Sequence, residues 1–435
     1  MTDIRNLASI LERTPLTYRL GRVKNLGTTS VDVAGLSDVA SIGDHVEFVK
    51  HEDLTGEITQ VSGESVRILI DGDFTNLKMN DVVRHIGEVK IYPDISWLGN
   101  VIDSHACTLD GGFLSQGGLG TGRNAKPPIA IERKPIGSRL SAGYAVMNTL
   151  LPLARGQRIG LFAGSGVGKS TLIAALASDL DVEVVVIALI GERGREVKHF
   201  VESVLGDKGL ARSVVIAATS DQSAISRRRA AFTAMAVAEY FRDQGLHVLL
   251  LVDSISRMAE AHREITSASG EPNSMRGYPP SLTALLAGFA ERAGPGTNLQ
   301  GDITAIFTVL VAGSDMEEPV ADTLRGLLDG HLVLSRDIAE RGRFPAIDVL
   351  QSVSRCLPEV ANDEENSLIS RTRHFLSLYE ESELMIRSGL YQAGSNTELD
   401  EAVRVFPKID HFLSMRCDGI TEAFDQLSEA IKPES

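Results

Sequence analysis

The sequence is short of cysteine, of positive charge and of long apolar runs. Its three cysteines, Cys107, Cys356 and Cys417, form no CxxC pair, which indicates free thiols in a reducing compartment rather than disulfides or structural zinc. The longest apolar run covers the seven residues 184–190, whereas a membrane-spanning helix needs about 20. The N-terminus carries acidic residues and lacks the apolar core of a signal peptide. We therefore expect a folded cytoplasmic protein.

Acidic residues outnumber basic ones by 58 to 43, which gives a formal net charge of −15. A protein that binds nucleic acid without regard to sequence needs a basic surface to displace counterions, so no nucleic-acid partner is expected. The ten histidines have no metal-ligand spacing. The 40 glycines follow no period, which excludes collagen-like and repeat architectures.

The pattern of residues changes along the chain, and 435 residues allow about three domains. Residues 1–18 contain a short amphipathic helix, and residues 19–91 consist of short alternating runs typical of a small β-barrel. Residues 92–359 begin with a glycine- and proline-rich connection and then alternate apolar runs with helical stretches, which predicts a parallel sheet covered on both faces. Residues 360–435 are rich in helix and have no strand pattern.

A glycine-rich loop follows the predicted strand 159–162 and precedes a predicted helix. Its sequence over 163–171, AGSGVGKST, matches the P-loop pattern except that Ala163 replaces the first glycine. Glycines let successive N–H groups turn toward an anion, and the helix N-terminus adds its dipole. The alternative, a glycine-rich turn with a chance lysine, does not account for the flanking strand and helix. The residues expected to bind a nucleotide are Gly164, Ser165, Gly166, Val167, Gly168, Lys169, Ser170 and Thr171.

A P-loop enzyme holds Mg²⁺ between its phosphate loop and a second carboxylate. We expect Lys169 to reach the β- and γ-phosphates and Ser170 to bind the metal ion. A buried apolar strand ends at Asp253, which is the position of the second metal ligand, although a helix N-cap is an alternative role for it. These residues predict binding of a Mg²⁺–nucleoside triphosphate, and by themselves they do not establish hydrolysis.

Hydrolysis also needs a group that orients water, and Glu192 is the candidate. It follows the apolar run 184–190, on a strand expected to lie next to that of the phosphate loop. Ligands of an open parallel sheet bind at the carboxyl ends of its strands, so Glu192 could face the γ-phosphate. A helix-capping or surface position is the alternative, and the residues alone do not decide between the two.

Motifs along nearly the whole chain resemble the catalytic subunits of rotary F- and V-type ATPases, most closely the flagellar protein-export ATPases of bacterial type III secretion. They occur in the family's order: AGSGVGKS, LIGERGREV, ATSDQS, AEYFRDQG, GYPPSL, DGHLVLSR, FPAIDV and SVSR. The resemblance implies an α/β fold with a RecA-like P-loop NTPase core, a small N-terminal β-barrel and a C-terminal helical domain. It also implies an ATPase that uses Mg²⁺ to hydrolyse ATP to ADP and phosphate.

The resemblance assigns roles to single residues. Glu192 matches the glutamate that activates water, Arg193 an arginine that arranges the phosphates, and Asp253 the metal-site aspartate. Arg355 matches the arginine finger that a neighbouring subunit inserts beside the γ-phosphate, a contribution of about 10³–10⁵ in rate. That role implies a homo-oligomer, a ring of six chains. The alternative for Arg355 is a solvated or intrachain-paired side chain.

Three further residues are implied in nucleotide binding. Phe344 and Tyr391 match the aromatic residues that enclose adenine, although isolated aromatic residues are more often part of a core. Arg229 lies in the arginine run 227–229 and matches a phosphate-side arginine. Because adjacent arginines point around a helix, solvation or pairing between subunits ranks first for this run, the nucleotide site second and nucleic acid last.

The resemblance further implies that ATP hydrolysis energises unloading and export of flagellar subunits at the cytoplasmic face of the export gate. The implied partners are the export gate, export substrates with their chaperones, and a regulator at the N-terminal helix. That helix carries Ile4, Leu7 and Leu11 on one face and could equally pack on the chain's own barrel. The implied location is the cytoplasm, peripheral at the inner face of the membrane.

Other functions are weighed against flagellar export. An injectisome ATPase and a synthase β-like subunit share the chemistry, but the loop 163–166 favours the flagellar branch. The segment 376–385 lacks the longer acidic segment by which the synthase subunit engages its rotor. A non-catalytic ring subunit lacks the carboxylate that Glu192 provides. The acidic charge balance disfavours an RNA translocase of the Rho type.

Overall fold

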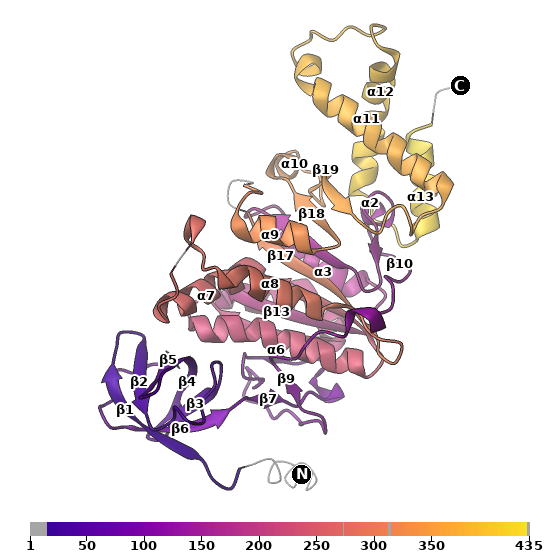
Figure 1. Cartoon of the computed structure of the whole chain (residues 1–435). Coiled ribbons are helices and arrows are strands. Elements are labelled where there is room, and N and C mark those ends of the chain that lie inside the picture. Colours follow the sequence, from indigo (N-terminus) through magenta and orange to yellow (C-terminus); the bar gives the residue numbers. More distant parts are fainter. Residues whose placement is uncertain (1–14, 273, 312–314, 433–435) are drawn as a thin grey trace.

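The computed structural model describes residues 15–272, 274–311 and 315–432. A small barrel lies at one end, a helical domain at the other, and a large sheet flanked by helices between them (Figure 1). This arrangement confirms the predicted fold class. The predicted N-terminal helix falls largely in residues 1–14, outside the described residues.

The N-terminal unit is a closed barrel in which β6 returns to pair with β1. Apolar and polar side chains alternate along its strands, so one face of each strand fills the interior. Val33, Phe48, Ile58 and Ile68 are almost fully buried there. In spatial order the strands are β1 (Arg19–Leu26), β2 (Ser30–Ala34), β5 (Val66–Asp71), β4 (His51–Val61), β3 (His45–Phe48) and β6 (Val82–Gly87).

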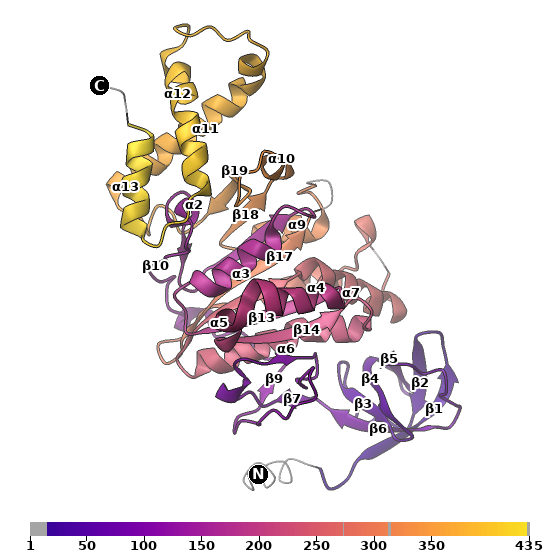
Figure 2. The same cartoon turned by 180° about the vertical axis from the view of Figure 1, so that it is seen from behind.

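A connection of short elements leads from the barrel to the sheet, and its first part lies along α6 (Ala224–Asp243) (Figure 2). The indole of Trp97 anchors it, because its N–H donates to the carbonyl of Ser115 at 2.7 Å within a buried setting. The short elements are β7 (Lys90–Ile91), η1 (Ile95–Trp97), β8 (Val101–Ile102), β9 (Thr121–Gly122), η2 (Ala130–Glu132), β10 (Arg139–Leu140), α2 (Ala145–Asn148) and β11 (Leu153–Ala154).

The central sheet has the strand order β19-β18-β12-β17-β15-β13-β14-β8. Neighbouring strands are parallel except that β19 runs against β18, and the short β16 (Gly294–Pro295) runs against β17. The continuous apolar runs of the sequence form its middle strands. The longer strands are β12 (Arg158–Ala163), β13 (Val184–Glu192), β14 (Ser213–Thr219), β15 (His247–Asp253), β17 (Asp302–Leu310), β18 (Gly330–Leu334) and β19 (Ile347–Ser354).

Helices cover both faces of this sheet, as the continuous apolar strands require. Alternate residues of β13 enter two separate cores: Ile187 and Leu189 face α3 (Lys169–Asp179), whereas Val186 and Ala188 face α6. The other helices of this region are α4 (Gly194–His199), η3 (Phe200–Leu205), α5 (Gly206–Ala211), α7 (Ile255–Ala268), η4 (Met275–Gly277), α8 (Ser281–Arg292), α9 (Pro319–Leu327) and α10 (Arg336–Glu340).

The C-terminal domain consists of α11 (Asp363–Arg387), α12 (Thr397–Ser414) and α13 (Ile420–Ala430). A capping box between Asn362 and Glu365 starts α11. Its apolar residues continue the core on the α3 side of the sheet. Among the described helices, none is both long enough and apolar enough to cross a lipid bilayer.

Candidate active site

The loop 164–168 joins the end of β12 to the first turn of α3, at the carboxyl edge of the sheet. Gly166 and Gly168 have φ values of 78° and 87°, a left-handed backbone that side chains rarely adopt, and Gly168 caps α3. This conformation suits a nest of inward-facing N–H groups at a helix N-terminus. Val167 is buried in the core beneath, which anchors the loop.

A cavity of about 760 Å³ opens over this loop. It brings the loop together with the ends of β13 and β14 and with the starts of α6 and α7. Every loop residue predicted to bind nucleotide lines it except Val167: Gly164, Ser165, Gly166, Gly168, Lys169, Ser170 and Thr171.

Lys169 lies between two carboxylates at this cavity. Its Nζ forms an ion pair with Asp253 at the end of β15 and lies 3.7 Å from Glu192 at the end of β13. Thr308 on β17 donates its hydroxyl hydrogen to the same Asp253 carboxylate oxygen at 2.7 Å. One cation between two carboxylates leaves the cluster with a net negative charge, which a divalent cation can neutralise.

The strand that carries Glu192 is not the neighbour of β12, so the expected adjacency is wrong. β17 and β15 lie between them, and the long side chain of Lys169 spans the gap. At Gly191, φ is 69° and an added Cβ would lie 3.0 Å from Cγ of Arg257, so glycine fits this turn. The turn breaks the register of β13 with β14 and sets Glu192 toward the cavity.

The carboxyl of Glu192 has a raised pKa. Burial is the main cause, the charge of Lys169 opposes it, and Asp253 and Glu196 add to the rise. A carboxyl group with a raised pKa can exchange protons closer to neutral pH than an ordinary glutamate does.

Ser170, Asp253 and Glu192 also line a smaller cavity of about 160 Å³. Ser170 supplies a hydroxyl oxygen and Asp253 a carboxylate oxygen, which are the oxygen donors that Mg²⁺ prefers. The two predicted metal ligands therefore meet at one place although 83 positions separate them in the sequence.

Arg193 lines the larger cavity, but its side chain is 67% exposed and pairs with Glu196 at 3.3 Å. The exposed guanidinium has little to hold it in place, because a surface ion pair contributes about 0–1 kcal/mol. It is therefore free to reorient toward an anion in the cavity.

Arg355 lies at the opposite edge of the sheet. Its N–H donates to the carbonyl of Asp329 at 3.0 Å, and the N–H of Asp329 donates to the carbonyl of Arg158 at the start of β12. The six residues of β12 span about 17 Å at roughly 3.3 Å per residue, and the phosphate loop follows their far end. Arg355 is thus not brought to the phosphate loop of its own chain, and its guanidinium bonds only the carbonyl of Arg325 among described residues.

The two aromatic candidates lie in different places. Phe344 is 51% exposed, and an added Cβ on Gly168 would lie 3.2 Å from its Cδ1, so its ring covers the phosphate loop. Tyr391 lies between α11 and α12, where its hydroxyl donates to the carboxylate of Asp400. Tyr391 lines neither cavity at the phosphate loop.

Arg229, which the resemblance implied in nucleotide binding, does not line the cavity over the phosphate loop. Its Nη1 pairs with Asp71 of the barrel at 2.8 Å, and it lines a different cavity. Successive side chains on a helix point about 100° apart, so only one arginine of the run can face the phosphates. That arginine is Arg227, which lines the cavity over the phosphate loop and pairs with Glu264.

Sequence reasoning also missed other residues of this cavity. Arg257 in the first turn of α7 and Ser220 after β14 both line it. Both follow strand ends at the carboxyl edge, the position that pointed to Glu192, so the same rule could have found them.

A phosphate loop at the carboxyl edge of a parallel sheet, with a lysine, a glutamate and an aspartate converging on it, defines a P-loop nucleotide-binding protein of RecA-like fold. Residues 143–354 match the ATP synthase alpha/beta family, nucleotide-binding domain, and residues 361–428 match the T3SS EscN ATPase C-terminal domain.

Comparison with whole proteins narrows the family. The chain is 40% identical to the flagellum-specific ATP synthase of Bacillus subtilis over 419 residues, which is 95% of each chain. It is 40% identical to that of Caulobacter vibrioides over 99% of this chain and 100% of the relative. The assembled ATPase EscN of the enteropathogenic E. coli type III secretion system superposes with a TM-score of 0.89 at 34% identity, over 95% of this chain and 100% of EscN. The chain belongs to the ATP synthase alpha/beta family, in the branch of the flagellum-specific ATP synthases and type III secretion ATPases.

Proposed function

We propose that the chain hydrolyses ATP to ADP and phosphate to energise flagellar type III protein export. The observation that carries the proposal is the convergence of Lys169, Glu192 and Asp253 at the phosphate loop, in a chain whose relatives are flagellum-specific ATP synthases. The backbone nest of the loop holds the phosphates, and Lys169 neutralises the charge that develops on them.

Mg²⁺ fits this site because Ser170 and Asp253 offer oxygen donors on one cavity and the cluster has a net negative charge. When bound, the ion would supply charge neutralisation between the phosphates. Glu192 orients water and accepts its proton in this proposal, which its raised pKa supports. Arg193 and Arg257 line the cavity, and their guanidinium groups would add positive charge beside the phosphates.

Arg355 acts in a neighbouring subunit under this proposal. It lies at the edge of the sheet opposite the phosphate loop, so a ring in which each chain presents this edge to the next would complete every site. Such head-to-tail contacts form a ring when the rotation from one chain to the next closes. The structure of assembled EscN has been solved, which supports a homo-oligomer here. We propose six chains.

We further propose the partners and location that the resemblance implied. These are the export gate, export substrates with their chaperones, and a regulator at the N-terminal helix, with the protein cytoplasmic and peripheral at the inner face of the membrane. Nucleic acid is not among them, because the net charge is −15. An injectisome ATPase is the second candidate, because EscN shares 34% identity, but 40% identity to flagellum-specific relatives favours the flagellar role.

The test is ATP hydrolysis and ATP binding by Glu192→Gln. We expect binding to persist and kcat to fall by about 10²–10⁴, the usual contribution of a general base. Hydrolysis at the wild-type rate in this variant would contradict the assigned mechanism.

A further inference from the structure

A second cavity, of about 270 Å³, lies where the barrel meets α6. It shares no lining residue with the cavity over the phosphate loop. Its walls come from the barrel, from the connection that follows the barrel and from α6 and α8. The proposed ATPase mechanism makes no use of it.

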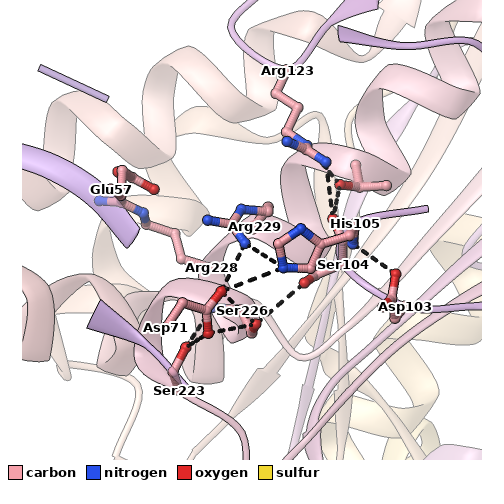
Figure 3. A network of polar contacts seen from close by, with 11 residues as sticks. Glu57, Asp71, Asp103, Ser104, His105, Arg123, Ser223, Ser226, Arg228 and Arg229 are labelled. Atoms are coloured by element: carbon pink, nitrogen blue, oxygen red, sulfur yellow. Dashed lines mark hydrogen bonds and ion pairs between the residues drawn. The ribbon is translucent and has the colours of Figure 1, made fainter. Parts of the chain in front are cut away.

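Three arginines line this cavity: Arg123 from the connection, and Arg228 and Arg229 from α6. Two of them have carboxylate partners on the barrel (Figure 3). Arg228 pairs with Glu57 of β4, and Arg229 pairs with Asp71 of β5 at 2.8 Å. These two ion pairs fasten the barrel to the central domain.

Arg123 differs because it has no ion pair within the described residues. Its Nε donates to the hydroxyl of Thr233 at 3.1 Å, and its Nη2 donates to the carbonyl of Ser104 at 3.2 Å. Both acceptors are neutral, and no partner for Nη1 is found in the part of the chain that the structure describes. Nη1 is not among the fully buried unpaired atoms, and Arg123 lines this cavity.

Two further carboxylates, Asp103 and Glu88, belong to this region. Asp103 accepts the backbone N–H groups of His105 and Cys107, each at 2.8 Å. Glu88 lines the cavity but is exposed. Burial and the charge of Arg229 lower the pKa of Arg123 to about 10, while the charges of Glu57 and Asp103 oppose them.

His45, on the barrel side of the cavity, lies in the same positive electrostatic potential. Its ring lies edge-on to that of His105, with centroids 5.9 Å apart, and it lines the cavity. Burial, followed by the charges of Arg229, His105 and Arg123, lowers its pKa to about 3, while Asp71 opposes them. The histidine is therefore neutral and can donate one N–H without adding charge.

We propose that this cavity binds a phosphate-type anion, namely inorganic phosphate or a phosphate monoester, through Arg123 and Arg229 with His45 as a neutral donor. The guanidinium fork matches phosphate oxygens, and burial strengthens each charge-assisted hydrogen bond. The apolar side chains of Ile42, Val89, Phe232 and Leu285 complete the lining and admit the organic part of an ester. The anion would link the barrel to α6, because its donors come from both.

The test uses the full chain with Lys169→Ala, without Mg²⁺, so that the phosphate loop no longer competes. Inorganic phosphate and glycerol 3-phosphate are titrated by calorimetry, and phosphatidylcholine vesicles with and without phosphatidic acid are tested by co-sedimentation. We expect one anion to bind per chain. Binding of the soluble probes supports a free phosphate, and binding only to vesicles with phosphatidic acid supports a lipid headgroup.

Adding Arg123→Gln is expected to weaken binding by about tenfold or more, the value of a charge-assisted bond. Arg373→Gln is the matched control, because Arg373 is also a partly buried arginine that donates to a backbone carbonyl, of Ser352, and it should bind like the parent. Ile42 is 72% exposed at the mouth, so Ile42→Glu should weaken binding and Ile42→Lys should strengthen it without touching the buried network.

If Arg123→Gln does not fold, the comparison of Ile42→Glu with Ile42→Lys decides whether the cavity binds the anion. The proposal is overturned if the Lys169→Ala chain binds none of the probes. It is also overturned if Arg123→Gln folds and binds like the parent, or if Ile42→Glu and Ile42→Lys bind alike. None of these outcomes depends on ATP hydrolysis, so they are separate from the test of the proposed function.

Discussion

The Nζ atom of Lys169 lies 3.7 Å from the carboxylate of Glu192, across two intervening strands of the sheet. Glu196, in the first turn of α4, acts against Lys169, because its hydrogen bond and its charge raise the pKa of Glu192. The protonation of the proposed water-orienting group thus depends on a neighbour that is accessible to mutation.

We predict that Glu196→Gln shifts the acid limb of the activity profile to lower pH. A general base must be deprotonated, so kcat/KM falls as the pH decreases through the pKa of Glu192, and removing a neighbouring negative charge lowers that pKa. The measurement is kcat/KM over roughly pH 5 to 9, a range that covers both limbs of the activity profile. Glu202→Gln, another exposed glutamate of this region, is the control, and an unshifted limb in Glu196→Gln would refute the coupling.

If Arg355 acts in a neighbouring subunit, two inactive variants should regain ATPase activity when they are mixed. Arg355→Ala keeps an intact phosphate loop, and Lys169→Ala keeps an intact Arg355. Random mixing makes about one interface in four complete, so we expect partial ATPase activity from the mixture and little from either variant alone. Activity is measured against protein concentration. Full activity of Arg355→Ala alone, independent of concentration, would exclude the subunit-interface site.

The ring of Phe344 covers Gly168, and this predicts a role in binding rather than in chemistry. Phe344→Ala should raise KM for ATP by about tenfold with little change in kcat, because stacking on a base contributes about 1–3 kcal/mol. Phe344→Tyr should retain the wild-type KM. The same kinetics on Tyr391→Phe should show no change, because the Tyr391 hydroxyl bonds Asp400 and not the cavity lining.

Burial of neutral histidines predicts a loss of stability in acid. Burial lowers the pKa of His247 and of His262 to about 4, from 6.5. The unfolded chain takes up these protons first, so the free energy of unfolding is highest above pH 6.5 and falls as the pH decreases toward 4. At pH 5 each histidine should cost about 2 kcal/mol. Urea unfolding is compared above pH 6.5 and at about pH 5. The loss of unfolding free energy between the two should be smaller in His247→Gln than in the parent, and unchanged in the exposed control His374→Gln.

The buried pair of Arg229 and Asp71 predicts a large effect of one barrel substitution. Asp71→Asn leaves the Arg229 charge unpaired, so unfolding should become easier by about 3–5 kcal/mol. Asp73→Asn, two positions away on the surface, is the control and should change little. Denaturant unfolding measures both, and equal stabilities of the two variants would show that the pair does not fasten the barrel.

The sequence by itself determined the fold class and the phosphate loop. A glycine loop between an apolar strand and a helix has one common physical use, and continuous apolar runs can only be buried by helices on both faces of a sheet. Lys169, Ser170, Glu192 and Asp253 were found because each one either belongs to that loop or ends such a strand.

Tertiary structure decided how far apart those residues are and which neighbours they have. Sequence order did not reveal that two strands separate Glu192 from the phosphate loop, nor that Arg355 lies at the far edge of the sheet. The arginine run 227–229 shows the reason most clearly. All three members are arginines, so the sequence does not distinguish them. The helix turns by about 100° per residue, which directs Arg227 to the phosphate cavity and Arg228 and Arg229 to the barrel. Only the packing of α6 between the phosphate cavity and the barrel gives the three side chains these different partners.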